Sequence, residues 1–218
     1  MALRVIAIDG PAGSGKSTVA RAVAARLGLE YLDTGAMYRS VAFAALRGDL
    51  DPGDDDGVGA LVDGLEIDVT DGVVTVDGVD ASIEIRGPEV TRAVSTVAAN
   101  PVVRAELRRR QQDWARERGG GVMEGRDIGS VVFPDAVLKV YLTASADARA
   151  GRRAREVTDL DYETVAADIA RRDALDQGRD DSPLTEAPGS VVIDTTDRAV
   201  DDIVDEVLAR LAESEANP

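Results

Sequence analysis

The sequence GPAGSGKS at residues 10–17 matches the pattern G-x-x-x-x-G-K-[ST] in full. Glycines at such a turn let backbone N–H groups approach phosphate oxygens without a Cβ clash, and the helix that follows points its positive dipole end at the same anion. Lys16 is placed to reach the β- and γ-phosphates, and the Ser17 hydroxyl is placed to ligate Mg²⁺. This stretch therefore predicts a loop that binds a nucleoside triphosphate.

The residues on either side of the loop have the patterns that the motif requires. Residues 3–9 (LRVIAID) form an apolar, β-branched run, which is typical of a buried strand. Apolar residues recur every four positions over 19–27, which predicts a helix ended by the following glycine. Residues 29–32 predict a second short strand and residues 37–47 a second helix. This β-α-β-α order predicts an α/β fold with a parallel sheet and helices on its faces.

The pattern changes after the second helix. Residues 49–60 read as an acidic, Gly-rich link, and from 65 to 85 the apolar residues alternate with a period of two. Asp-Gly pairs at 71–72 and 77–78 are strong hairpin signals. The segment therefore predicts a small antiparallel meander inserted between βα units. At 218 residues the chain is long enough for one domain of roughly 150 residues that carries such an insert.

The second half of the chain returns to alternating helices and strands. We predict a helix over 101–118, strands at 122–124 and 136–142, a helix near 161–175, a strand at 191–194 and an amphipathic helix over 200–211.

Composition excludes several classes of function. The chain has 25 basic and 41 acidic residues, and a net charge of −16 argues against a nucleic-acid or anionic-membrane surface. It has no cysteine and no histidine, which excludes disulfides, Ser–His–Asp catalysis and imidazole metal ligands. No stretch reaches the roughly 18 apolar residues of a membrane span, and we expect no signal peptide before the first strand. We therefore expect a cytoplasmic chain with no nucleic-acid or membrane partner.

A triphosphate-binding loop alone is shared by kinases, GTPases, ATPases and motors. The sequence contains neither an N-K-x-D guanine reader nor a clear hydrophobic strand that ends in Asp-Glu. Arginine, the residue suited to bidentate phosphate recognition, gathers downstream of the loop instead. A kinase whose acceptor is already a phosphate needs no general base, so the lack of histidine is compatible with that activity.

The arginines and the acidic runs also have simpler interpretations. Arg149, Arg152 and Arg153 fit the solvated face of an ordinary helix equally well. The acidic runs at 51–56 and 180–181 are interpreted as solvated loops. Arg126 follows a predicted strand, at the carboxyl end where open α/β sheets bind ligands, and there we favour a functional role.

Seven sequence segments indicate a particular family more specifically than the phosphate loop alone does. In order and spacing the chain resembles the bacterial cytidylate (CMP) kinases over nearly its whole length. The matching segments are IDGPAGSGKST (8–18), LDTGAMYR (32–39), VSTVAANPVVR (94–104), EGRDIGSVVFPDA (124–136), RRAR (152–155), RRDALDQGRDDSPL (171–184) and IDTT (193–196). One small departure is Ser130, where the family more usually has threonine.

The resemblance implies a three-layer P-loop fold with a five-stranded parallel sheet and helices on both faces. It also implies a monophosphate-binding insert at 34–96, which carries the small antiparallel sheet, and a lid at 149–172. The implied reaction transfers the γ-phosphoryl group of ATP to CMP or dCMP with Mg²⁺. We expect a monomer.

The resemblance further implies a role for each matching residue. The implied ATP-binding residues are Gly10, Pro11, Ala12, Gly13, Ser14, Gly15, Lys16, Ser17 and Thr18, with Ser17 also as the metal ligand. Arg39 and Arg126 are implied to hold the acceptor phosphate, Asp176 to contact the ribose and Asp127 to orient this site. The implied cytosine-side residues are Ser95, Arg104 and Arg179, and Thr34, where the family has a Ser or Thr, is implied to belong to the same substrate site. The implied catalytic residues are Lys16, Arg126 and Arg172, joined by the lid residues Arg149, Arg152 and Arg153.

Two alternatives stay open from the sequence. A related small-substrate kinase acting on UMP, AMP or shikimate would carry the same loop. A nucleotide-dependent switch that slowly hydrolyses triphosphate belongs to a different class, and it predicts a partner-binding surface for which we find no apolar patch in the sequence.

Overall fold

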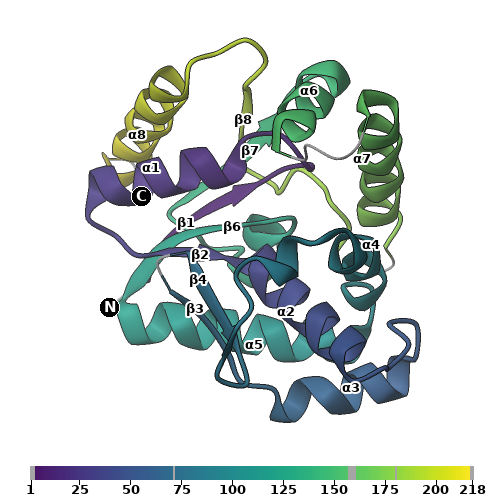
Figure 1. The fold of residues 1–218 in the computed structure, drawn as a ribbon. Helices are drawn as coiled ribbons and strands as arrows, with labels where there is room; N and C mark the ends of the chain where they lie inside the picture. The colour runs from purple at the N-terminus through teal and green to yellow at the C-terminus, as the bar shows by residue number, and fades with distance from the viewer. Residues whose placement is uncertain (1–2, 71, 157–160, 180, 217–218) are drawn as a thin grey trace. The chain divides into compact units, whose positions relative to one another are not determined.

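The computed structural model describes residues 3–70, 72–156, 161–179 and 181–216. The chain divides into two compact units (Figure 1). The first comprises Met1–Tyr31 and Ala115–Pro218, and the second comprises Leu32–Trp114.

The first unit is built on a parallel sheet with the strand order β2-β6-β1-β7-β8. The strands are β1 (Arg4–Asp9), β2 (Tyr31–Asp33), which starts at the last residue of this unit, β6 (Gly120–Gly125), β7 (Leu138–Thr143) and β8 (Val191–Asp194). Strand β1 pairs in parallel with β6 and β7, and β8 pairs in parallel with β7. β1 is buried over nearly its whole length, as expected of a continuous apolar run at the centre of a parallel sheet. The predicted five-stranded parallel sheet is confirmed.

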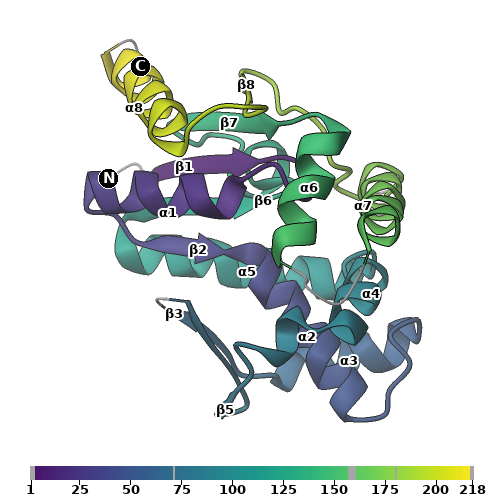
Figure 2. The ribbon, with the colours of Figure 1, turned by 45° about the horizontal axis from the view of Figure 1, so that its top comes forward.

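Helices α1 (Lys16–Leu27) and α8 (Val200–Ala216) pack together beside this sheet (Figure 1). Their apolar faces and the strands form one core, which includes Ile6, Ile8, Val19, Val23, Leu142, Val204 and Val207. Helices α6 (Ala146–Glu156) and α7 (Tyr162–Gln177) pack on each other through Ala150, Val165 and Ile169 (Figure 2). Residues 157–160 of the predicted lid lie outside the described residues, as does Asp180 of the second acidic run.

The second unit joins helices to a three-stranded sheet. Its helices are α2 (Thr34–Arg47), α3 (Asp55–Gly64), the short 3-10 helix η1 (Glu84–Arg86), α4 (Pro88–Val97) and most of α5 (Pro101–Arg118). Its strands are β3 (Ile67–Thr70), β4 (Val73–Val76) and β5 (Val79–Asp80), in antiparallel order β3-β4-β5. At the second hairpin, Asp77 and Gly78 have φ of 49° and 74°, the left-handed pair that an Asp-Gly turn requires. The predicted meander is confirmed up to Asp80, but the end of the predicted segment is not strand, because the 3-10 helix η1 begins at Glu84.

Two helices of this unit depart from the sequence-based expectation. The segment 49–60, expected to be a link, enters helix α3 at Asp55. Asp54 caps this helix by accepting from the Gly57 N–H at 3.1 Å, and acidic residues in the first turn complement its dipole. Helix α4 was not predicted, although Pro88 at its start is a position that proline favours.

Within the described ranges, no helix combines the length and the apolar character needed to cross a membrane.

Candidate active site

The phosphate loop joins β1 to α1 in the first unit, and close packing requires its glycines. Gly10 has φ of 148°, and a Cβ there would lie 2.1 Å from the Leu142 carbonyl oxygen. Gly13 has φ of 74°, and a Cβ there would lie 2.9 Å from the carbonyl oxygen of Arg149 on α6. The backbone of the loop thus lies directly against β7 and α6, which only glycine permits.

Lys16 is buried at the first turn of α1. Its Nζ donates to the Pro11 carbonyl oxygen at 2.8 Å, so the ammonium is turned back into its own loop. Burial, reinforced by the positive charges of Arg126 and Arg172, lowers the pKa of Lys16 to about 7, against the opposing carboxylates of Glu124 and Asp9. An anion in the loop would favour the charged ammonium, because it adds negative charge beside the buried Lys16.

Ser17 faces a carboxylate that sequence reasoning missed. Its Oγ donates to Oε2 of Glu124 at 3.0 Å, and the hydroxyl of Tyr31 donates to Oε1 of the same side chain. Glu124 lies near the carboxyl end of β6, where the parallel register pairs it with Ile8. The sequence carries a signal for this residue, an acid at the end of a predicted buried strand, although it is not part of an Asp-Glu pair.

Asp9 connects the end of β1 to the segment that follows β6. Its carboxylate accepts from the backbone N–H groups of Ile128 at 2.9 Å and Gly129 at 2.8 Å, at the start of the π-helical turn η2 (Ile128–Val132). Burial raises the pKa of Asp9 to about 6, and nearby Asp127 adds to this, while the two N–H donors and Lys16 oppose it. Asp9 therefore holds the turn that directly follows Arg126 and Asp127.

Arg126 and Arg179 share one buried carboxylate. Arg126 Nε donates to Asp176 Oδ2 at 2.7 Å, and Arg179 donates to the other oxygen of Asp176. Burial would raise the pKa of Asp176, but the guanidinium groups of Arg126, Arg179 and Arg172 outweigh it, so this pKa lies below its usual range. The structure thus brings together four of the predicted site residues within the first unit.

Two of the arginines predicted to belong to a lid, Arg149 and Arg152, lie on α6 and contact the phosphate loop. Arg149 donates to the Ala12 carbonyl oxygen at 3.2 Å and pairs with Asp173. Arg152 donates to both Oγ1 and the carbonyl oxygen of Thr195, at 2.9 and 2.6 Å. These contacts show that Arg149 and Arg152 are not simply part of a solvated helix face. Arg153 lies on the same helix.

In the second unit, Asp33 organises the start of α2. Its Oδ1 caps the helix by accepting from Ala36 N–H at 2.9 Å, and its Oδ2 pairs with Arg39 at 2.7 Å and lies 3.9 Å from Arg86. Burial would raise the pKa of Asp33, but Arg39, the Ala36 N–H and Arg86 lower it overall. Thr34, the first residue of α2, is buried beside this group.

Arg104 is a buried cation of the second unit. It is 2% exposed and donates from Nη1 to the Ala98 carbonyl oxygen at 3.2 Å. Its guanidinium carbon lies 5.7 Å from the centre of the Tyr38 ring. Ser95 is buried on α4. This unit therefore holds four further predicted residues, Thr34, Arg39, Ser95 and Arg104, on α2, α4 and α5.

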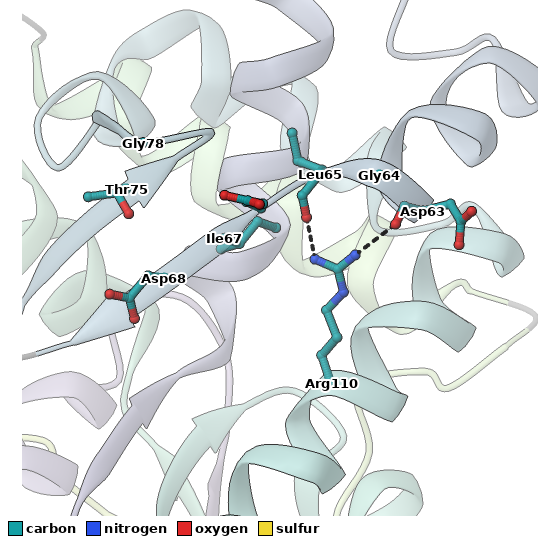
Figure 3. A pocket seen from close by; sticks show the side chains of 9 residues that line it. Asp63, Gly64, Leu65, Ile67, Asp68, Thr75, Gly78 and Arg110 are labelled. Atoms are coloured by element: carbon teal, nitrogen blue, oxygen red, sulfur yellow. Dashed lines mark hydrogen bonds between the residues drawn. The ribbon is translucent and has the colours of Figure 1, made fainter.

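The second unit also has an open hollow beside β3 (Figure 3). Arg110 extends into its wall and donates to the carbonyl oxygens of Val62 at 2.7 Å and Leu65 at 2.6 Å. None of the predicted site residues lines this hollow. Arg110 has a structural role there, since it satisfies carbonyl groups at the end of α3.

Comparison with known proteins relates the chain to a family. A family model described as cytidylate kinase matches residues 6–213. A cytidylate kinase of Mycobacterium avium (strain 104) is 49% identical over 210 residues, which cover 92% of this chain and 92% of that protein. A cytidylate kinase of Chromobacterium violaceum is 43% identical over 221 residues, which cover 100% of this chain and 99% of that protein.

Solved structures of low sequence identity share the fold. An uncharacterized protein from Eubacterium ventriosum ATCC 27560 has a TM-score of 0.56 at 12% identity, covering 95% of this chain and 98% of that chain. A gluconokinase from Sinorhizobium meliloti 1021 has a TM-score of 0.50 at 17% identity, covering 97% of this chain and 93% of that chain. These likenesses support the α/β fold alone.

Proposed function

This chain belongs to the cytidylate kinase family, and from that premise we propose that it transfers the γ-phosphoryl group of ATP to CMP or dCMP, giving ADP and CDP or dCDP. The expected family and the expected class of enzyme, a nucleotide phosphotransferase directed at CMP, are confirmed by this membership. The alternatives, a kinase for another small acceptor and a regulatory switch, are correspondingly disfavoured.

The observation that carries the proposal is the cluster of cations at the phosphate loop. Lys16 lies close enough to Arg126 and Arg172 for both guanidinium groups to lower its pKa. A polyanion that enters the loop would add favourable interactions with these cations to those that the carboxylates of Glu124 and Asp176 already make. Preorganised cations also stabilise the charge that spreads over a phosphoryl group in transfer. We assign the catalytic roles to Lys16, Arg126 and Arg172 on this ground.

We assign acceptor binding to the remaining predicted residues. Arg39 and Arg126 would hold the phosphate of the monophosphate, because each is already oriented by a buried carboxylate, Asp33 or Asp176. Ser95, Arg104 and Arg179 would contact the cytosine, and Asp176 would contact the ribose. Thr34 would belong to the same substrate site, and Asp127 would orient it. The burial of Ser95 and Arg104 supports this role, since buried polar groups discriminate between bases by their unmet hydrogen bonds.

The donor set of the loop fits a magnesium ion. Mg²⁺ prefers hard oxygen ligands, and the Ser17 hydroxyl lies within hydrogen-bond distance of the Glu124 carboxylate. Among the described residues no cluster of three or more acidic, Cys or His side chains forms a metal site, so most ligands would come from phosphate oxygens and water. Ser17 would ligate the ion and Glu124 would hold it or its waters. The bound ion would neutralise phosphate charge.

We propose boundaries for the monophosphate-binding insert and for the lid from the same resemblance. Residues 34–96 would form the monophosphate-binding insert and residues 149–172 the lid. The residues from Gly10 to Thr18 would bind ATP, and Arg149, Arg152 and Arg153 would close over it. We further propose that the enzyme acts as a monomer in the cytoplasm. Sedimentation velocity tests the first of these claims.

The test of the proposed function is ADP release by the purified chain in the presence of ATP and Mg²⁺. A kinase should release ADP slowly without an acceptor and should accelerate sharply when CMP is added. A regulatory switch would release ADP at the same rate with or without CMP.

A further inference from the structure

Tyr31 has no assigned role in the proposed function. It opens β2 in the first unit, its ring packs at the margin of the apolar core, and its hydroxyl donates to Oε1 of Glu124. The other oxygen of that carboxylate accepts from Ser17 at 3.0 Å. One buried carboxylate therefore bridges a tyrosine and the loop serine.

The direction of these hydrogen bonds has a chemical consequence for Ser17. A serine hydroxyl has one proton and two lone pairs. Because its proton is directed at Glu124, the lone pairs of Oγ are available to a cation. Glu124 is 4% exposed, so the orientation of its carboxylate is set by its donors rather than by bulk water.

The tyrosine is itself held in place. The guanidinium carbon of Arg21 lies 5.3 Å from the centre of the Tyr31 ring, a distance suited to a cation–π contact. Arg21 and Ser17 lie on the same helix, α1, one turn apart. The ring is thus fixed to the helix that carries the metal-binding hydroxyl.

We propose that Tyr31 is a positioning residue for magnesium–nucleotide binding, which acts through Glu124 to hold the Ser17 hydroxyl in its ligating orientation. This inference rests on the proposed function, because it assumes that the loop binds ATP with Mg²⁺. Tyr31 touches neither nucleotide nor metal in this account, so its loss should weaken only the contribution that magnesium makes to binding.

The test is calorimetric binding of ATP to the full chain, measured with Mg²⁺ and again with EDTA. In Tyr31→Phe, which keeps the ring and removes the hydroxyl, we expect the gain in affinity from Mg²⁺ to fall by about threefold to tenfold. This is less than the full worth of one hydrogen bond to a charged group, because Tyr31 acts on the ion only through Glu124 and Ser17. Affinity in EDTA should stay within about twofold of wild type. Ser214→Ala, which removes a hydroxyl bonded to the Val137 carbonyl oxygen far along the chain, should match wild type in both conditions.

A double-mutant cycle separates positioning through Glu124 from other effects. Glu124→Ala should abolish most of the magnesium gain, and adding Tyr31→Phe to it should change nothing further. The proposal would be overturned if Tyr31→Phe reduced the gain in ATP affinity from Mg²⁺ equally with and without Glu124. It would also be overturned if Tyr31→Phe left this gain unchanged, or if it weakened ATP binding equally in EDTA. Wild-type chain that gains no affinity from Mg²⁺ and makes no CDP would instead overturn the proposed function, and the two failures are therefore distinguishable.

Discussion

The ammonium of Lys16 donates a hydrogen bond to the carbonyl oxygen of Pro11, with 2.8 Å between Nζ and O. A side chain that is to hold a phosphate is therefore turned into its own loop, in a setting that lowers its pKa to about 7. Binding of a triphosphate must replace this contact and restore the charge on the ammonium. Several consequences of that change are measurable.

ATP binding should take up a proton. At pH 8 a Lys16 side chain with a pKa of about 7 is mostly the neutral amine in the empty loop, and the bound anion should raise this pKa, so most of one proton is taken up per ATP. Calorimetry in two buffers of different ionisation enthalpy measures this number. Lys16→Met should show much smaller uptake, and wild type with no uptake at pH 8 would contradict the assignment.

Lys16→Ala should fold normally and lose nearly all turnover. The lost ammonium is a preorganised electrostatic contact to the phosphates, worth about 10²–10³ in kcat. Lys139, the other lysine of the chain, donates to the Pro134 carbonyl oxygen. Circular dichroism checks the fold and a coupled ADP assay checks the rate; a folded variant with wild-type kcat would refute the role of the loop.

Arg126→Lys should not restore what Arg126→Ala loses. The guanidinium of Arg126 is oriented by Asp176 at 2.7 Å, and an ammonium would supply the charge without the planar fork that grips a phosphate. Both variants should lose CMP turnover and keep ATP affinity. If both lost ATP affinity in equal measure, Arg126 would belong to the donor side instead.

Asp9→Asn should change how stability depends on pH. The pKa of Asp9 is raised by burial to about 6, so its contribution to stability is fully present below about 3.8 and is lost as the pH rises through 6. Between pH 5 and 7 wild type should therefore lose about 1 kcal/mol of unfolding free energy relative to Asp9→Asn.

The same variant should also be less stable overall, by about 1–3 kcal/mol, because one of the N–H groups of Ile128 and Gly129 loses its acceptor. Urea unfolding at the two pH values measures both effects. A stability difference that is the same at pH 5 and pH 7 would show that Asp9 does not titrate in this range.

Local patterns predicted the sheet, the meander and the phosphate loop because each has a period or a turn signal of its own. Helix α3 was missed because its Gly-rich, acidic start imitates a link, and only the cap by Asp54 reveals it. Glu124, Tyr31 and Thr195 were missed for a different reason. Their roles depend on contacts with residues distant in the chain, 107 positions in the case of Ser17 and Glu124, which no local spacing encodes.

The most direct test of the account is the acceptor specificity of the purified enzyme, measured as kcat/KM with ATP and Mg²⁺ for CMP, dCMP, UMP and AMP, with the nucleotide products separated and identified. We predict CDP or dCDP in equal amount to ADP. CMP and dCMP should be preferred over UMP by at least about tenfold, since each unmet hydrogen bond in a buried site costs roughly 1–3 kcal/mol. AMP should be a poor acceptor. Phosphorylation of UMP or AMP as efficiently as CMP would contradict the assigned cytosine site, and ADP release without any CDP would contradict the activity itself.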